Sequence, residues 1–118
     1  MNVENPRADY HSQQQKREYF RLVYPHEFRP VLMCRGQEYQ VVNLSEYGVS
    51  FRVDDSEDFN LGQELVADIV FHDQQHFGCR GEIIRLAGNR VALSLSLPIP
   101  LYKIRSENIF LIGRFARI

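Results

Sequence analysis

Two arginines near the N-terminus, Arg17 and Arg21, stand four residues apart, with Lys16 directly before them. A guanidinium group offers a planar fork of N–H donors that can pair with a phosphate or with the O6 and N7 acceptors of a guanine. Residues 16–21 carry a local charge of +2, whereas the whole chain has a formal net charge of −1. The spacing is compatible with a site for an anion or a nucleotide, and also with two solvated arginines on the surface.

A second group of three residues, Asn43, Ser45 and Gly48, lies in the stretch Asn-Leu-Ser-Glu-Tyr-Gly. An asparagine amide both donates and accepts hydrogen bonds, and a serine hydroxyl can donate to a phosphate or base oxygen. Glycine lets the backbone approach a ligand because it has no Cβ. The alternative is a plain strand connection, in which Asn43 and Ser45 bond their own backbone and Gly48 supplies a positive φ. That connection would hold the same groups in place, so it is compatible with a ligand function.

The elements that would position these groups begin at about residue 28, where short apolar runs alternate with turn-forming residues. Alternation between apolar and polar residues indicates strands with one buried face. Six such strands with short connections favour an all-β fold, a closed or nearly closed antiparallel barrel in which no edge is exposed. The expected strands cover 28–34, 37–43, 48–53, 63–71, 76–86 and 90–97, and the last is expected to turn Val91, Leu93, Leu95 and Leu97 inward.

Both ends of the chain depart from this pattern. Residues 1–15 are polar and include three consecutive glutamines, which indicates a flexible N-terminal arm before a domain that covers 16–118. After Pro100, helical spacing returns and predicts a helix over about 101–115 that caps one mouth of the barrel. The face of this helix that should meet the barrel contains Leu101, Ile104, Asn108, Leu111, Ile112 and Phe115.

Composition limits the classes of function. A chain of 118 residues forms one domain, and a pI of about 6.4 argues against a broad face for nucleic acid. There is no apolar run long enough for a membrane span and no signal-peptide pattern at the N-terminus, so we expect a cytoplasmic protein. In such a protein Cys34 and Cys79 are expected to be reduced thiols.

Other candidate sites are weaker. His72, His76 and Cys79 have a spacing that suggests metal ligands, but they flank an expected hairpin turn and lack a fourth ligand nearby in the sequence. No arrangement of nucleophile, acid and base is evident. We therefore expect no enzyme activity, no metal and no cofactor.

Taken together, the two motifs resemble the signature of the PilZ domain family, RxxxR followed by [D/N]xSxxG, here Arg17 and Arg21 and then Asn43, Ser45 and Gly48. The resemblance covers roughly residues 15–115. It implies a six-stranded antiparallel barrel that binds cyclic di-GMP, a bacterial second messenger, through these five residues. Lys16 adds a third cation, at the position that in this family affects whether one nucleotide or a stacked pair binds.

The resemblance also implies a mechanism in which ligand binding draws the segment around Arg17 and Arg21 onto the barrel. The arm would then present a new surface to a downstream protein partner, which the sequence does not identify. One alternative is an interaction module of the same fold that binds no nucleotide. Another is a module for single-stranded nucleic acid, against which the near-neutral charge counts.

Overall fold

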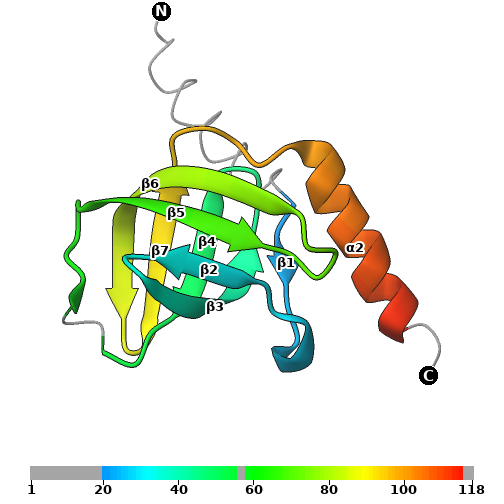
Figure 1. Ribbon diagram of the computed structural model, residues 1–118, viewed down its shortest axis with the longest axis horizontal. Coiled ribbons are helices and arrows are strands. Elements are labelled where there is room, and N and C mark those ends of the chain that lie inside the picture. The colour runs from blue at the N-terminus through cyan, green and yellow to red at the C-terminus, as the bar shows by residue number, and fades with distance from the viewer. Residues whose placement is uncertain (1–19, 56–57, 116–118) are drawn as a thin grey trace, which may run out of the picture.

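The computed structural model describes residues 20–55 and 58–115, and its central element is a closed antiparallel barrel (Figure 1). The six strands are hydrogen-bonded in the ring order β3-β2-β5-β6-β7-β4, and pairing between β3 and β4 closes the ring. The expected all-β barrel is therefore confirmed. Its strands are β2 (Val31–Cys34), β3 (Gln37–Leu44), β4 (Gly48–Arg52), β5 (Glu64–Val70), β6 (His76–Ala87) and β7 (Arg90–Leu95).

A short strand that the sequence did not predict, β1 (Leu22–Val23), precedes the barrel. It pairs antiparallel with the end of β3, so that Leu22 lies opposite Leu44 and Val23 opposite Asn43. A two-residue strand contains too few positions to show alternation, so its place in the sheet depends on the partner strand. A 3-10 turn, η1 (His26–Phe28), then leads into β2.

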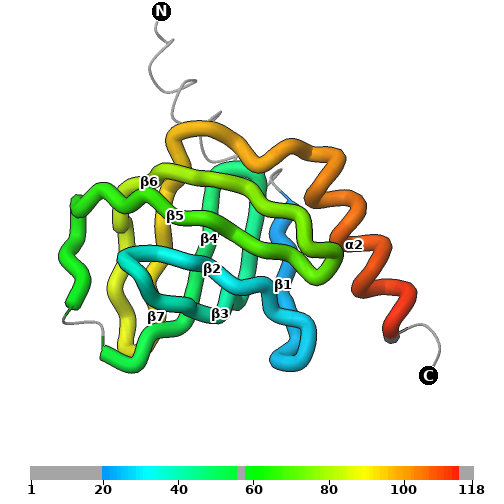
Figure 2. Tube along the Cα trace, in the orientation of Figure 1, coloured from blue at the N-terminus to red at the C-terminus, as the bar shows by residue number. Residues whose placement is uncertain are grey.

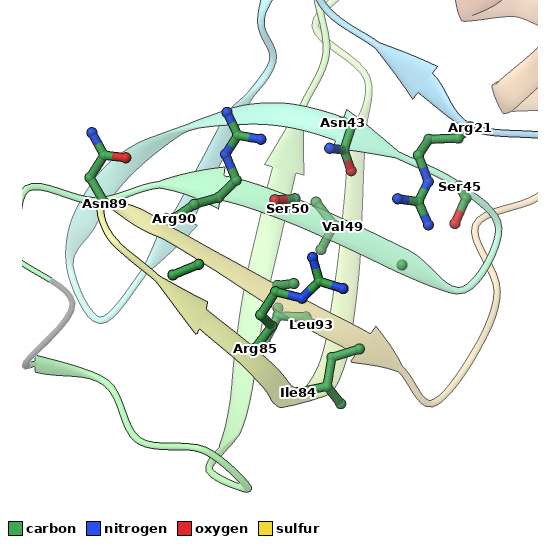
Figure 3. Close-up of a pocket in the computed structure, with 13 residues that line it drawn as sticks. Arg21, Asn43, Ser45, Val49, Ser50, Ile84, Arg85, Asn89, Arg90 and Leu93 are labelled. Carbon is green, nitrogen blue, oxygen red and sulfur yellow. The ribbon is translucent and has the colours of Figure 1, made fainter.

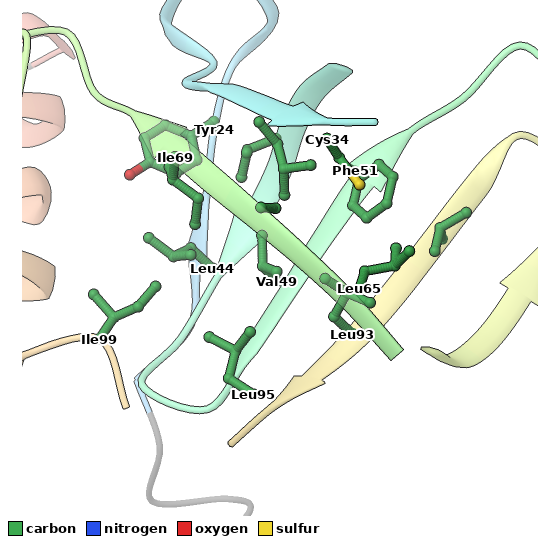
Figure 4. Close-up of a cluster of buried hydrophobic side chains, with 14 of the residues drawn as sticks. Tyr24, Cys34, Leu44, Val49, Phe51, Leu65, Ile69, Leu93, Leu95 and Ile99 are labelled. Carbon is green, nitrogen blue, oxygen red and sulfur yellow. The ribbon is translucent and has the colours of Figure 1, made fainter. Parts of the chain in front are cut away.

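The barrel core follows from the alternation along the strands (Figure 4). Leu32, Val49, Phe51, Ile69 and Leu93 are at most 2% exposed and come from four different strands. One part of the prediction was wrong: β7 ends at Leu95, and Leu97 lies beyond it with its side chain exposed.

The C-terminal helix, α2 (Leu101–Phe115), lies at one end of the barrel beside β1 and the β5–β6 turn (Figures 1 and 2). Its predicted bounds are confirmed, but its predicted buried face is only partly right. Ile104 and Leu111 are buried in the core, whereas Leu101 and Ile112 are exposed. None of the described helices has the length and apolar character that a membrane span requires.

Two charged residues of α2, Lys103 and Glu107, are each only 1% exposed. Glu107 Oε1 accepts a hydrogen bond of 2.8 Å from the Tyr24 hydroxyl, and Lys103 Nζ donates one of 2.8 Å to Asp73 Oδ2. His72 Nδ1 lies 3.0 Å from Glu107 Oε2. Burial and the neighbouring Glu107 carboxylate raise the pKa of Tyr24. We call these five residues the helix-anchoring cluster.

Candidate functional site

A cavity of about 470 Å³ opens on the outer face of the barrel (Figure 3). This volume lies in the range typical of sites for small molecules. The residues that line it come from the segment before β1, from β3 and β4, and from the β6–β7 hairpin. They are Arg21, Asn43, Ser45, Gly48, Val49, Ser50, Ile84, Arg85, Ala87, Asn89, Arg90, Ala92 and Leu93.

Four of the residues predicted from the sequence meet at this cavity: Arg21, Asn43, Ser45 and Gly48. The pairing of β1 with β3 brings Arg21 beside the end of β3, where Ser45 follows. Figure 3 shows the guanidinium of Arg21 on the same side of the sheet as Ser45. Arg17 and Lys16 lie outside the described residues, so their contribution to this site stays a prediction.

A β-bulge directs Asn43 to the cavity. Val41 pairs with Phe51, but the next pair is Asn43 with Ser50, so Val42 is an extra residue in β3. Side chains alternate along a regular strand, so without a bulge Val41 and Asn43 would lie on the same face. The bulge breaks this alternation. Because of the extra residue, Val41 is in the core while Asn43 lies on the outer face at the cavity wall.

Main-chain hydrogen bonds fix the connection between β3 and β4. The Ser45 N–H donates to the Gly48 carbonyl at 2.8 Å. The N–H groups of Leu95 and Ile99 donate to the carbonyls of Tyr47 and Glu46, at 2.8 and 2.7 Å. The turn that carries Ser45 is therefore held to the end of β7 and to the segment that follows it.

The alternative in which this turn is only a strand connection was wrong in two details. The side chains of Asn43 and Ser45 form no hydrogen bond with any described residue, so they do not bond their own backbone. Gly48 does not have a positive φ. A Cβ at this position would lie 3.2 Å from Ser45 Oγ, a tight contact. Gly48 therefore leaves space beside the hydroxyl, and the polar groups of Asn43 and Ser45 are available to a ligand.

Residues of the β6–β7 hairpin that the sequence did not single out complete the cavity, among them Arg85, Asn89 and Arg90. The Val53 N–H donates to the Asn89 carbonyl at 2.8 Å, which holds the hairpin turn against the end of β4. These residues belong to no motif with fixed spacing, and only the pairing of strands distant in sequence brings them to the site.

The charged residues that line the cavity are all arginines. Arg21, Arg85 and Arg90 form no ion pair with a described residue, and no acidic residue is among those that line the cavity. Uncompensated guanidinium groups around one cavity favour an anionic ligand.

The other candidate residues are engaged elsewhere. His72 stacks on Phe110, with ring centroids 3.6 Å apart, and His76 Nδ1 lies 2.6 Å from Asp68 Oδ2. In the part of the chain that is described, no group of three or more His, Cys, Asp or Glu side chains is arranged to hold a metal ion. Burial raises the pKa of the Cys79 thiol to about 11, so this thiol is protonated at neutral pH.

Comparison with known proteins adds evidence on the family. The family model described as PilZ domain matches residues 15–106. The fold is similar to that of the Bacillus subtilis inhibitor of motility MotI/DgrA, with a TM-score of 0.61 at 15% identity over 76% of this chain. This chain spans 50% of that protein. It is also similar to the uncharacterised Legionella protein Lpg0364, with a TM-score of 0.54 at 18% identity, over 84% of this chain and 95% of that one. No curated protein matches the sequence.

Proposed function

Because the chain belongs to the PilZ domain family, we propose that it is a receptor for cyclic di-GMP. PilZ domains are binding modules rather than catalytic ones. The residues proposed to contact the ligand are those of the two motifs together with the preceding lysine: Lys16, Arg17, Arg21, Asn43, Ser45 and Gly48.

The observation that carries this proposal is the meeting of Arg21 with Asn43, Ser45 and Gly48 at one cavity. Arg21 is distant in sequence from the other three, and the β1–β3 pairing brings it to them. If the two motifs had unrelated roles, there would be no reason for their residues to line the same cavity, or for that cavity to have no acidic residue in its lining.

The chemistry of the ligand suits these groups. Cyclic di-GMP carries two phosphodiester charges and two guanines. Arg21 can donate two hydrogen bonds to a phosphate or to the O6 and N7 of a guanine. The Asn43 amide can donate and accept at a guanine edge, and the Ser45 hydroxyl can donate to a phosphate or base oxygen.

We also propose how binding would be transmitted. Contacts from Arg17 and Arg21 to one ligand would fix the segment before β1 against the barrel, and residues 1–15 would then offer a new surface to a downstream protein. Two phosphate charges can offset the entropy lost when such a segment is ordered. Because the proposed ligand is a messenger inside bacterial cells, the cytoplasm is the proposed location.

Isothermal titration calorimetry with cyclic di-GMP tests the proposal directly. The wild type should bind, and Arg21→Ala should bind about ten- to a hundredfold more weakly, the usual effect of losing hydrogen bonds to a charged group. Arg80→Ala is the matched control, because Arg80 is exposed on β6 but does not line the cavity. Absence of binding to the wild type, or equal affinities for wild type and Arg21→Ala, would refute the proposal.

One observation favours a second function, an interaction module that needs no nucleotide. Tyr102, Ile109 and Ile112 of α2 are all more than half exposed, and such apolar side chains on one helix are typical of a protein contact. Under this function a partner would bind equally with and without cyclic di-GMP, and the titration above would give no heat.

A further inference from the structure

The wall of the cavity opposite Arg21 is formed by β6, the β6–β7 turn and the start of β7, and neither motif accounts for it. Arg85 and Arg90 lie on this wall. Figure 3 shows the Arg85 side chain extending from β6 toward the space that Arg21 reaches from the other side.

A second β-bulge places Arg85 there. Ile83 pairs with Leu93, but the next pair is Arg85 with Ala92, so Ile84 is an extra residue in β6. Without the extra residue Arg85 would share the inward face of Ile83, where a guanidinium would be buried in the apolar core. With it, Ile84 and Arg85 are both exposed on the cavity side and Leu86 packs against the core.

Strand register then sets the separation between the two walls. Asn43 pairs with Ser50, Ser50 with Ala92, and Ala92 with Arg85, so these residues form one row across four adjacent strands. With neighbouring strands about 4.8 Å apart, the row spans about 14 Å. Its two central side chains are small. The row therefore forms a shallow floor, with Asn43 and Arg21 at one edge and Arg85 at the other.

On the premise of the proposed function, we propose that Arg85 is a second ligand contact, which binds a phosphate or guanine of cyclic di-GMP on the side away from Arg21. The motif residues around Arg21, Asn43 and Ser45 lie at one edge of this row and can hold one half of the ligand. The row across β3, β4, β7 and β6 gives the other half an arginine of its own. Arg90, which also lines the cavity, adds to the positive potential that attracts the ligand.

The test compares cyclic di-GMP affinities of Arg85→Ala, Arg85→Lys and Arg52→Ala by isothermal titration. Arg52 is the matched control: it is exposed on β4 and pairs with Arg90 in the register, but it does not line the cavity. Arg85→Ala should weaken binding about ten- to a hundredfold. Arg85→Lys should fall between wild type and Arg85→Ala, since it keeps the charge but loses the planar fork. Arg52→Ala should bind like the wild type.

The outcomes separate this proposal from the proposed function. Binding by wild type, loss in Arg21→Ala and no loss in Arg85→Ala would overturn the role of Arg85 and leave the receptor function standing. Equal losses in Arg85→Ala and Arg52→Ala would also overturn it, because then only long-range charge would matter. A wild type that does not bind would overturn both. Unchanged thermal unfolding of the variants, expected for exposed side chains, would show that each change in affinity is local.

Discussion

At the scale of single residues, Gly48 acts through the space that it leaves. Its φ is not in the left-handed region, so its backbone conformation is open to other residues. The space around the residue restricts a side chain more than the backbone does, because a Cβ at this position would lie 3.2 Å from Ser45 Oγ and 3.7 Å from the Leu93 carbonyl oxygen. The hydroxyl can rotate away from such a Cβ, and its direction, rather than the stability of the barrel, would then change.

Gly48→Ala is therefore expected to weaken cyclic di-GMP binding several-fold and to leave the free energy of unfolding within about 0.5 kcal/mol of wild type. Calorimetric titration and urea unfolding measure the two quantities. Gly78→Ala is the control, because a Cβ at Gly78 on β6 has no atom within 4 Å. A large loss of stability in Gly48→Ala would contradict this account, since it would mean that the hydroxyl cannot give way.

At the scale of elements, two bulges determine which side chains reach the cavity. The sequence predicted the six strands because alternation is a local pattern, and it predicted Asn43 because a motif with fixed spacing contains it. It could not predict Arg85 as a lining residue. The extra residue Ile84 reverses the alternation, and only pairing with β7 reveals it.

The helix α2 shows a second limit of sequence patterns. Apolar spacing predicted its length, but Lys103 and Glu107 occupy buried positions while Leu101 and Ile112 are exposed. Charged residues are rarely buried unless they are paired. The partners of these two residues, Tyr24 and the β5–β6 turn, are distant in sequence. No local pattern along the helix could therefore indicate that charged residues are buried and apolar ones exposed.

Glu107→Ala should destabilise the protein by about 3–5 kcal/mol, because it leaves Lys103 buried with less compensation and removes the acceptor of the Tyr24 hydroxyl. Urea unfolding followed by circular dichroism measures the loss. Ser106→Ala, an exposed neighbour on α2, should stay close to wild type. A loss of less than about 1 kcal/mol in Glu107→Ala would mean that the cluster does not anchor the helix.

At the scale of the whole molecule, the helix-anchoring cluster joins three parts of the chain. Tyr24 follows β1, His72 and Asp73 belong to the β5–β6 turn, and Lys103 and Glu107 lie on α2. Since Arg21 directly precedes β1 and Tyr24 directly follows it, the ligand cavity and the cluster lie at the two ends of one short strand. Barrel and helix are thus connected through polar groups as well as through the apolar core.

Acid should weaken this connection at Asp73. The hydrogen bond from Lys103 lowers the pKa of Asp73 below its ordinary value of about 3.9, so the interaction contributes fully above that pH and is lost as the pH falls through the lower, folded-state pKa. Asp73→Asn should therefore cost stability at pH 7, by less than about 1 kcal/mol because the Asp73 side chain is 41% exposed. The difference from wild type should shrink between pH 4 and pH 2.5. Urea unfolding at pH 7, 4 and 2.5 measures this difference in stability.

A Lys103→Met background provides the control. There the pH-dependent part of the difference should largely disappear, since Lys103 is the main cause of the lowered pKa of Asp73. A difference between wild type and Asp73→Asn that stays constant over this pH range would show that the charge of Asp73 does not contribute to anchoring α2.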